Sequence, residues 1–99
     1  MSLQFIGDAG VYLPERDAVK VTAIAGDTVV ECFISRSALK ALGCRESDTA
    51  AEIVRKFEAR RLDCELAALV KFRRATARLL SIETDAADIA AAIERPHAA

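Results

Sequence analysis

The feature that most constrains the fold is a pair of runs rich in β-branched residues, 19–25 and 28–35, separated only by Gly26-Asp27. Glycine at the first position of a two-residue turn is typical of a type II′ β-hairpin. That turn pairs residue 25 with 28 and residue 19 with 34. This register places six apolar side chains on one face: Val19, Val21, Ala23, Val30, Cys32 and Ile34. A slip by one residue would mix the two faces, so we predict this register.

Helix signals follow the hairpin. Ser35 is an N-cap candidate for a two-turn helix that Gly43 ends. Ser47 or Asp48 then caps a helix that we expect to run uninterrupted to about Arg74, because neither Gly nor Pro lies within it. One arc of this long helix is apolar apart from one arginine, and it comprises Ile53, Phe57, Arg61, Cys64, Ala68 and Phe72.

Two more segments read as strands, residues 3–6 and 76–83, and a short alanine-rich helix is expected over 86–94 between the cap Asp85 and the terminator Pro96. The predicted fold class is α+β. It is an antiparallel sheet of three to four strands with one long helix packed across it and two short helices. We expect one compact domain over residues 1–95 and a disordered tail over 96–99.

The spacing of these residues resembles that of a family of small bacterial proteins, the domain-of-unknown-function family 1488. The residues that carry the resemblance are Phe5, Val19, Val21, Ala23, Gly26, Val30, Cys32, Ile34, Ser35, Ala38, Leu39, Gly43, Phe57, Arg61, Cys64, Ala68, Lys71, Phe72, Ile82 and Asp85. The chain departs from the pattern at position 21, where an aromatic is expected, and at position 64, where an aliphatic is expected. The resemblance implies a compact α+β fold without an assigned activity.

Composition argues against several classes of protein. The net charge is −1, so nothing draws the whole chain toward nucleic acid or anionic lipid. No apolar run is long enough to span a bilayer, and residues 1–5 lack the layout of a secretory signal. Three cysteines at wide spacing are typical of reduced thiols rather than of a disulfide framework. We therefore expect a bacterial cytoplasmic protein.

No constellation of residues indicates catalysis. The only histidine, His97, lies in the expected tail, where nothing would hold a general base in position. The glycines form neither of the common phosphate-binding patterns, and the cysteines do not have zinc-ligand spacing. We expect no catalytic, cofactor or metal site and no enzyme activity. Whether Cys44, next to Arg45, is a reactive thiol stays open.

Charge is distributed unevenly along the chain. Residues 55–78 carry eight basic against three acidic side chains, a net charge of +5, and the remainder carries −6. Candidate contacts to an anion or a partner are Arg61, Arg73, Arg74 and Arg78. Basic residues at a helix C-terminus also complement the helix dipole, which is an alternative explanation. Arg61 lies on the apolar arc, where it either forms an internal salt bridge or anchors an acidic ligand.

A second apolar stripe lies on the opposite side of the same helix and comprises Leu62, Leu66 and Leu69. A helix that is apolar on two sides is covered within its own fold or by another chain. The leading hypothesis is a non-enzymatic protein-interaction or regulatory module that forms a homo-oligomer through this helix. The alternative is a nucleic-acid-associated accessory protein that uses the basic part of the helix.

Overall fold

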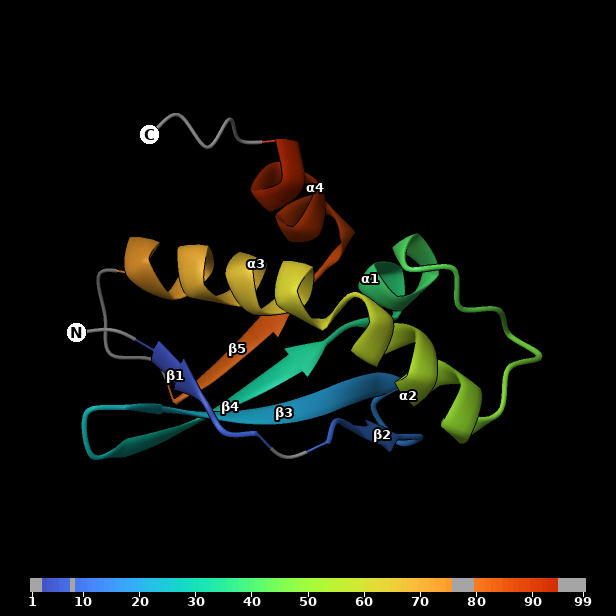
Figure 1. Ribbon diagram of the computed structural model, residues 1–99, viewed down its shortest axis with the longest axis horizontal. Helices are drawn as coiled ribbons and strands as arrows, with labels where there is room; N and C mark the ends of the chain where they lie inside the picture. Colours follow the sequence, from blue (N-terminus) through green and yellow to red (C-terminus); the bar gives the residue numbers. More distant parts are fainter. Residues whose placement is uncertain (1–2, 8, 76–79, 95–99) are drawn as a thin grey trace.

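The computed structural model of the protein describes residues 3–7, 9–75 and 80–94. Within these ranges it contains five strands and four helices (Figure 1). In chain order the elements are β1 (Leu3–Phe5), β2 (Val11–Leu13), β3 (Ala18–Ala25), β4 (Thr28–Ile34), α1 (Arg36–Ala41), α2 (Ala50–Ala59), α3 (Arg61–Arg74), β5 (Ser81–Thr84) and α4 (Ala86–Glu94).

The strands form one sheet in the order β1-β3-β4-β5, and β2 also pairs with β3, on the same side as β1. The predicted α+β class is confirmed. The sheet is mixed, however, with five strands, rather than antiparallel with three to four, because β5 runs parallel to β4. The helices between β4 and β5 form a crossover that returns the chain in the same direction, as a parallel pair requires.

The hairpin of β3 and β4 has the predicted register, with Val19 opposite Ile34 and Ala25 opposite Thr28. Gly26 has a φ of 65°, in the left-handed region that the first position of the turn requires. All six side chains of the predicted apolar face are buried. The register prediction is therefore confirmed. The physical reason for this register is that only this pairing hides the whole apolar face.

The predicted helix signals at Ser35, Gly43 and Asp85 are also confirmed. The Ser35 hydroxyl accepts a hydrogen bond from the backbone N–H of Ala38 at the start of α1. Gly43, with a φ of 95°, follows the end of α1. The Asp85 carboxylate accepts from the N–H of Asp88, and α4 spans the expected residues 86–94.

The prediction of one uninterrupted long helix is wrong. The helix breaks at Arg60, where φ is −122° and ψ is 23°, and α2 and α3 lie on either side of it. Tertiary packing determines the break: α2 lies against β2, whereas α3 lies against β1 and β5. The N-cap expected at Ser47 or Asp48 is also wrong. Thr49 caps α2 in a reciprocal capping box with Glu52.

Two predicted segments fall partly outside the described residues. The strand expected over 76–83 is observed as Ser81–Thr84, and residues 76–79 are not described. The tail expected over 96–99 is likewise outside the described part. Strand β2 was missed, because three residues between Gly10 and Pro14 give no periodic signal.

The core lies between the sheet and the helices, and α4 packs on α3 and α1 (Figure 1). Phe57 of α2 and Leu39 of α1 are fully buried in it, as are Val19 and Val30 of the hairpin. α3 packs against the sheet on one side, and α4 packs against it on the side that faces away from the sheet. Among the described helices, none is long and apolar enough to cross a membrane.

Candidate functional site

The three thiols lie inside the fold as free cysteines. Burial raises the pKa of Cys32 to about 11 and that of Cys64 to about 12. Cys44, the candidate for a reactive thiol, is only 6% exposed, and burial raises its pKa as well. Since the thiolate is the nucleophilic form, all three positions favour the unreactive thiol. Among the described residues, no three metal-ligating side chains gather.

Arg61 is held by carboxylates of its own chain. Its guanidinium pairs with Glu58 at 2.9 Å and with Glu65 at 2.8 Å, and it also donates to the backbone oxygen of Ile6 at 3.2 Å. The side chain is 15% exposed, so the charge is compensated where it is partly desolvated. These contacts give Arg61 an internal role that ties the start of α3 to the segment after β1.

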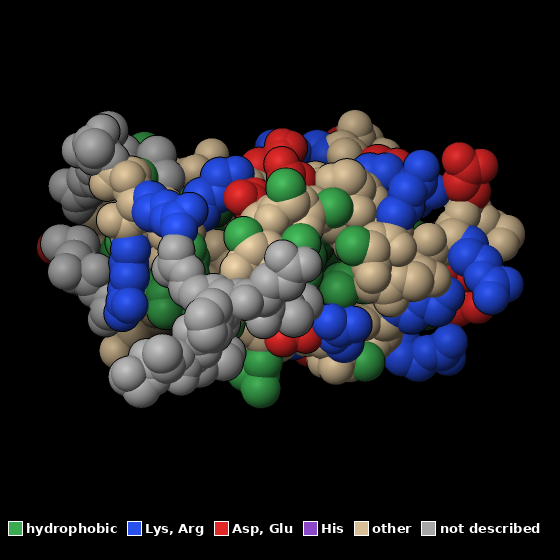
Figure 2. Space-filling view, turned by 90° about the horizontal axis from the view of Figure 1, so that it is seen from above, with side chains coloured by type: hydrophobic (Ala, Val, Ile, Leu, Met, Phe, Trp, Pro, Cys, Tyr) green, Lys and Arg blue, Asp and Glu red, His purple; other side chains and the backbone are tan. Residues whose placement is uncertain are grey.

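Three further basic side chains of the segment are paired in the same way. Lys56 pairs with Asp48 at 2.6 Å, Arg60 with Asp63 at 2.8 Å and Lys71 with Asp88 at 3.0 Å. Arg73 and Arg74 are exposed in the last turn of α3, and Arg78 lies outside the described residues. In Figure 2, Lys and Arg side chains gather toward the two ends of the helical face, with hydrophobic side chains between them. Within the described residues, four of the basic side chains of this segment are therefore already paired with carboxylates, counting Arg61.

The three leucines of the second apolar stripe differ in how far they are buried. Leu66 and Leu69 are partly buried and pack against the core. Leu62 is 80% exposed, next to a hollow of about 360 Å³ formed by residues 58–63 at the break between α2 and α3. Leu62 is therefore one exposed apolar side chain at the start of α3, in a hollow whose other walls include Glu58, Arg60, Arg61 and Asp63.

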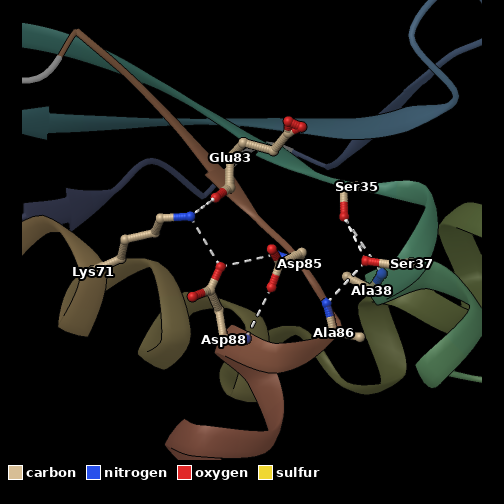
Figure 3. A network of polar contacts seen from close by, with 8 residues as sticks. All are labelled: Ser35, Ser37, Ala38, Lys71, Glu83, Asp85, Ala86 and Asp88. Carbon is tan, nitrogen blue, oxygen red and sulfur yellow. Dashed lines mark hydrogen bonds and ion pairs between the residues drawn. The ribbon is translucent and has the colours of Figure 1, made fainter.

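A polar junction closes the β5 side of the molecule (Figure 3). Lys71 of α3 donates to the backbone oxygen of Glu83 at 2.5 Å and to the Asp88 carboxylate at 3.0 Å. Asp85 and Asp88 exchange N–H-to-carboxylate hydrogen bonds at the start of α4, and Ser37 of α1 accepts from the N–H of Ala86 at 3.1 Å. The junction joins four elements through hydrogen bonds and one ion pair within the chain, which indicates a structural role.

A shallow groove lies between β2 and α2, at the edge of the sheet opposite to β5, and we call it the edge groove. Its volume is about 550 Å³, and its walls are formed by Gly10, Val11, Tyr12, Ala50, Ala51, Val54 and Arg55. Val11 is 52% exposed although it is β-branched and apolar. Apart from Arg55, the walls are small or apolar residues and one tyrosine.

The edge groove is positioned by Gly10. Its N–H donates to the Glu58 carboxylate at 2.9 Å, which joins the start of β2 to the end of α2. A Cβ atom at Gly10 would lie 2.8 Å from both the Phe57 ring and the Val19 side chain, so only glycine allows this approach. This hydrogen bond also lowers the pKa of the Glu58 carboxyl, with a further contribution from Arg61.

Sequence reasoning missed this groove. Arg55 belongs to the basic segment 55–78, and the sequence analysis predicts no element over residues 11–13. The run Val11-Tyr12-Leu13 is β-prone, and that is the only signal that could have indicated a strand here. The pairing of this run with α2 depends on contacts distant in sequence.

These observations define a class: a small two-layer α+β domain with its helices on one side of a mixed sheet. The chain matches the family of proteins of unknown function DUF1488 over residues 3–82, and it belongs to that family. The predicted family is thereby confirmed.

A solved structure gives the same fold. It is the crystal structure of a DUF1488-family protein of unknown function from Shewanella loihica, which is 21% identical in sequence. The match has a TM-score of 0.67 and covers 85% of this chain and 92% of the other. No curated protein matches the sequence.

Proposed function

We propose that this protein is a non-enzymatic interaction or regulatory module of the bacterial cytoplasm that self-associates through α3. The observation that carries the proposal is the 80% exposure of Leu62 at the head of the stripe it forms with Leu66 and Leu69. Burying a leucine side chain contributes about 1.5–3 kcal/mol. A two-fold interface uses the same patch on both subunits, so each exposed leucine counts twice.

Accessory binding to nucleic acid is the alternative, and the exposed pair Arg73 and Arg74 favours it. Against it stands the pairing of Lys56, Arg60 and Lys71 with carboxylates. Binding to nucleic acid depends on releasing counterions from phosphates, and a cation already paired with a carboxylate contributes less to it. We therefore place this alternative second.

Light scattering at low and high salt, with absorbance read at 260 and 280 nm, tests both. We expect a dimer that persists at high salt and is free of nucleic acid, because apolar burial is not screened. Leu62→Glu should convert it to a monomer. Leu80→Glu is the matched control, since Leu80 is 63% exposed but lies before β5, and this variant should stay dimeric.

A wild-type protein that stays monomeric at high concentration contradicts self-association. Nucleic acid that co-purifies with the protein and dissociates at high salt would favour the alternative instead. In that case Arg73→Gln combined with Arg74→Gln should abolish the co-purification.

A further inference from the structure

We propose that the edge groove binds an extended internal segment of a partner protein, in which a glutamate or aspartate side chain stands beside an apolar one. The groove lies between β2 and α2, whereas the proposed self-association uses the exposed leucine of α3. This inference therefore goes beyond the proposed function and does not depend on it.

The backbone of β2 indicates an extended ligand. Within the described part of the chain, β2 pairs with β3 alone, so its other side is a sheet edge with backbone groups outside the ladder. Extended peptides bind such edges by adding a strand. β2 has only three residues, from Val11 to Leu13, so the backbone can supply few of the contacts. Side chains of the groove must supply the rest.

The walls of the groove define the apolar part of the ligand. Val11, on the strand, is 52% exposed, and Ala50 and Ala51, on the facing helix, are also exposed. Small residues on one wall leave room for side chains of an incoming segment. Their burial, together with that of Val11 and Val54, is favourable.

Charge complementarity defines the polar part. Arg55 is exposed at the groove, and among the residues that the structure describes none forms a hydrogen bond or ion pair with it. Its charge does help to lower the pKa of the Glu52 carboxyl, three residues earlier on α2. Its neighbours in sequence and on the next turn, Lys56 and Arg60, are both paired with carboxylates. A planar guanidinium that is exposed beside an apolar groove fits a carboxylate geometrically.

The carboxylate is that of a side chain rather than of a chain terminus. A terminal carboxylate is commonly held by backbone N–H groups, for which the start of α2 would be the source. The Thr49 hydroxyl already accepts from the N–H of Glu52 there, and the Glu52 carboxylate accepts from the N–H of Thr49. The N–H groups of Ala50 and Ala51 also lie in this first turn, so the assignment to a side-chain carboxylate rests on the Arg55 guanidinium, which lies in the second turn of α2.

Fluorescence anisotropy with a labelled peptide, acetyl-Ser-Val-Glu-Val-Glu-Ser-amide, tests the inference on the intact protein. Its ends are blocked, so its only carboxylates are those of side chains. We expect saturable binding that weakens about fivefold in Arg55→Gln, the effect of losing one exposed ion pair. Arg73→Gln, at another exposed arginine, is the matched control and should leave the affinity unchanged.

A second variant tests the location. Ala51→Glu places a negative charge in the groove at the start of a helix, where acidic residues favour folding. It should repel the peptide at least as strongly as Arg55→Gln weakens it. The peptide with glutamine in place of glutamate should bind more weakly than the original.

Two results with the glutamate peptide would overturn the inference: no binding at millimolar concentration, or equal affinity for wild type and Arg55→Gln. A third would be tighter binding of a glutamine peptide whose C-terminal carboxylate is left free than of the blocked glutamate peptide. Leu62→Glu separates the two proposals. If it abolishes the dimer and leaves peptide affinity unchanged, the surfaces are independent. If it abolishes peptide binding, the edge groove is not the site.

Discussion

Two edge strands of the sheet, β5 and β2, differ in the contacts that their outer sides make. At the β5 edge, the Lys71 ammonium donates to the Glu83 backbone oxygen and is itself paired with Asp88 (Figure 3). At the β2 edge, one hydrogen bond from Gly10 to Glu58 joins strand and helix, and a groove opens beside it. A lysine that occupies an edge carbonyl blocks pairing with another strand. The β5 edge is therefore blocked at Glu83, whereas the β2 edge carries the groove proposed to bind a partner.

The largest expected effect is on the β2 edge, from Gly10→Ala. The new Cβ would lie 2.8 Å from Phe57 and Val19, so the strand or the ring must move. Overpacking of this kind costs about 1–3 kcal/mol in the free energy of unfolding. Urea denaturation measures it. Gly7→Ala is the control, because a Cβ there meets no atom within 4 Å. Equal stabilities of the two variants would show that the approach of β2 to α2 is not tight.

The second effect is a gain in stability in β5, just before the polar junction. The hydroxyl of Thr84 is fully buried and has no hydrogen-bond partner among the described residues. Thr84→Val removes this unsatisfied group at nearly the same shape, and we expect the free energy of unfolding to rise by about 1 kcal/mol. Thermal unfolding measures the change. A lower melting temperature would mean that the hydroxyl has a partner in solution.

The third effect tests whether the β5 edge is closed by its lysine. Lys71→Ala removes a half-exposed ion pair and the donor to Glu83, and should cost about 0.5–1 kcal/mol. It should also increase association through the uncovered edge, which light scattering detects as a higher mass. Lys20→Ala is the control, because Lys20 pairs with Glu31 at 3.5 Å on the open face of the sheet. Association equal to that of this control would argue that Lys71 does not protect the edge.

The smallest expected effect is the dependence of stability on pH. The N–H of Gly10 lowers the pKa of Glu58 in the folded protein. A depressed carboxyl pKa stabilises the fold above the unfolded value, near 4.3, and this contribution is lost as pH falls through the folded pKa. Urea midpoints between pH 7 and pH 3 should decline less in Glu58→Gln than in wild type. Parallel curves for the two proteins would mean that Glu58 does not contribute.

Local patterns in the sequence sufficed for much of the fold. The hairpin register follows from β-branched alternation and Gly26, and the ends of α1 and α4 follow from caps at Ser35 and Asp85. Each of these signals lies within a few residues of the structure it specifies. The α+β class and the family follow from them.

The break at Arg60 and the parallel pairing of β5 were decided by tertiary structure. No Gly or Pro marks the break, and the two helices separate because they pack on different strands. The direction of β5 depends on how the crossover packs on the sheet, which the residues of β5 do not encode.

The candidate site divides in the same way. The sequence by itself determined that Leu62 belongs to an apolar stripe and that residues 55–78 carry an excess of positive charge. Only the tertiary structure decided that Leu62 is exposed, that Arg61 is paired and that Arg55 faces a groove. The physical reason is distance along the chain. A stripe or a charge run is a local property, whereas exposure and pairing depend on segments such as β2 and α2, brought together by the Gly10–Glu58 hydrogen bond across 48 positions.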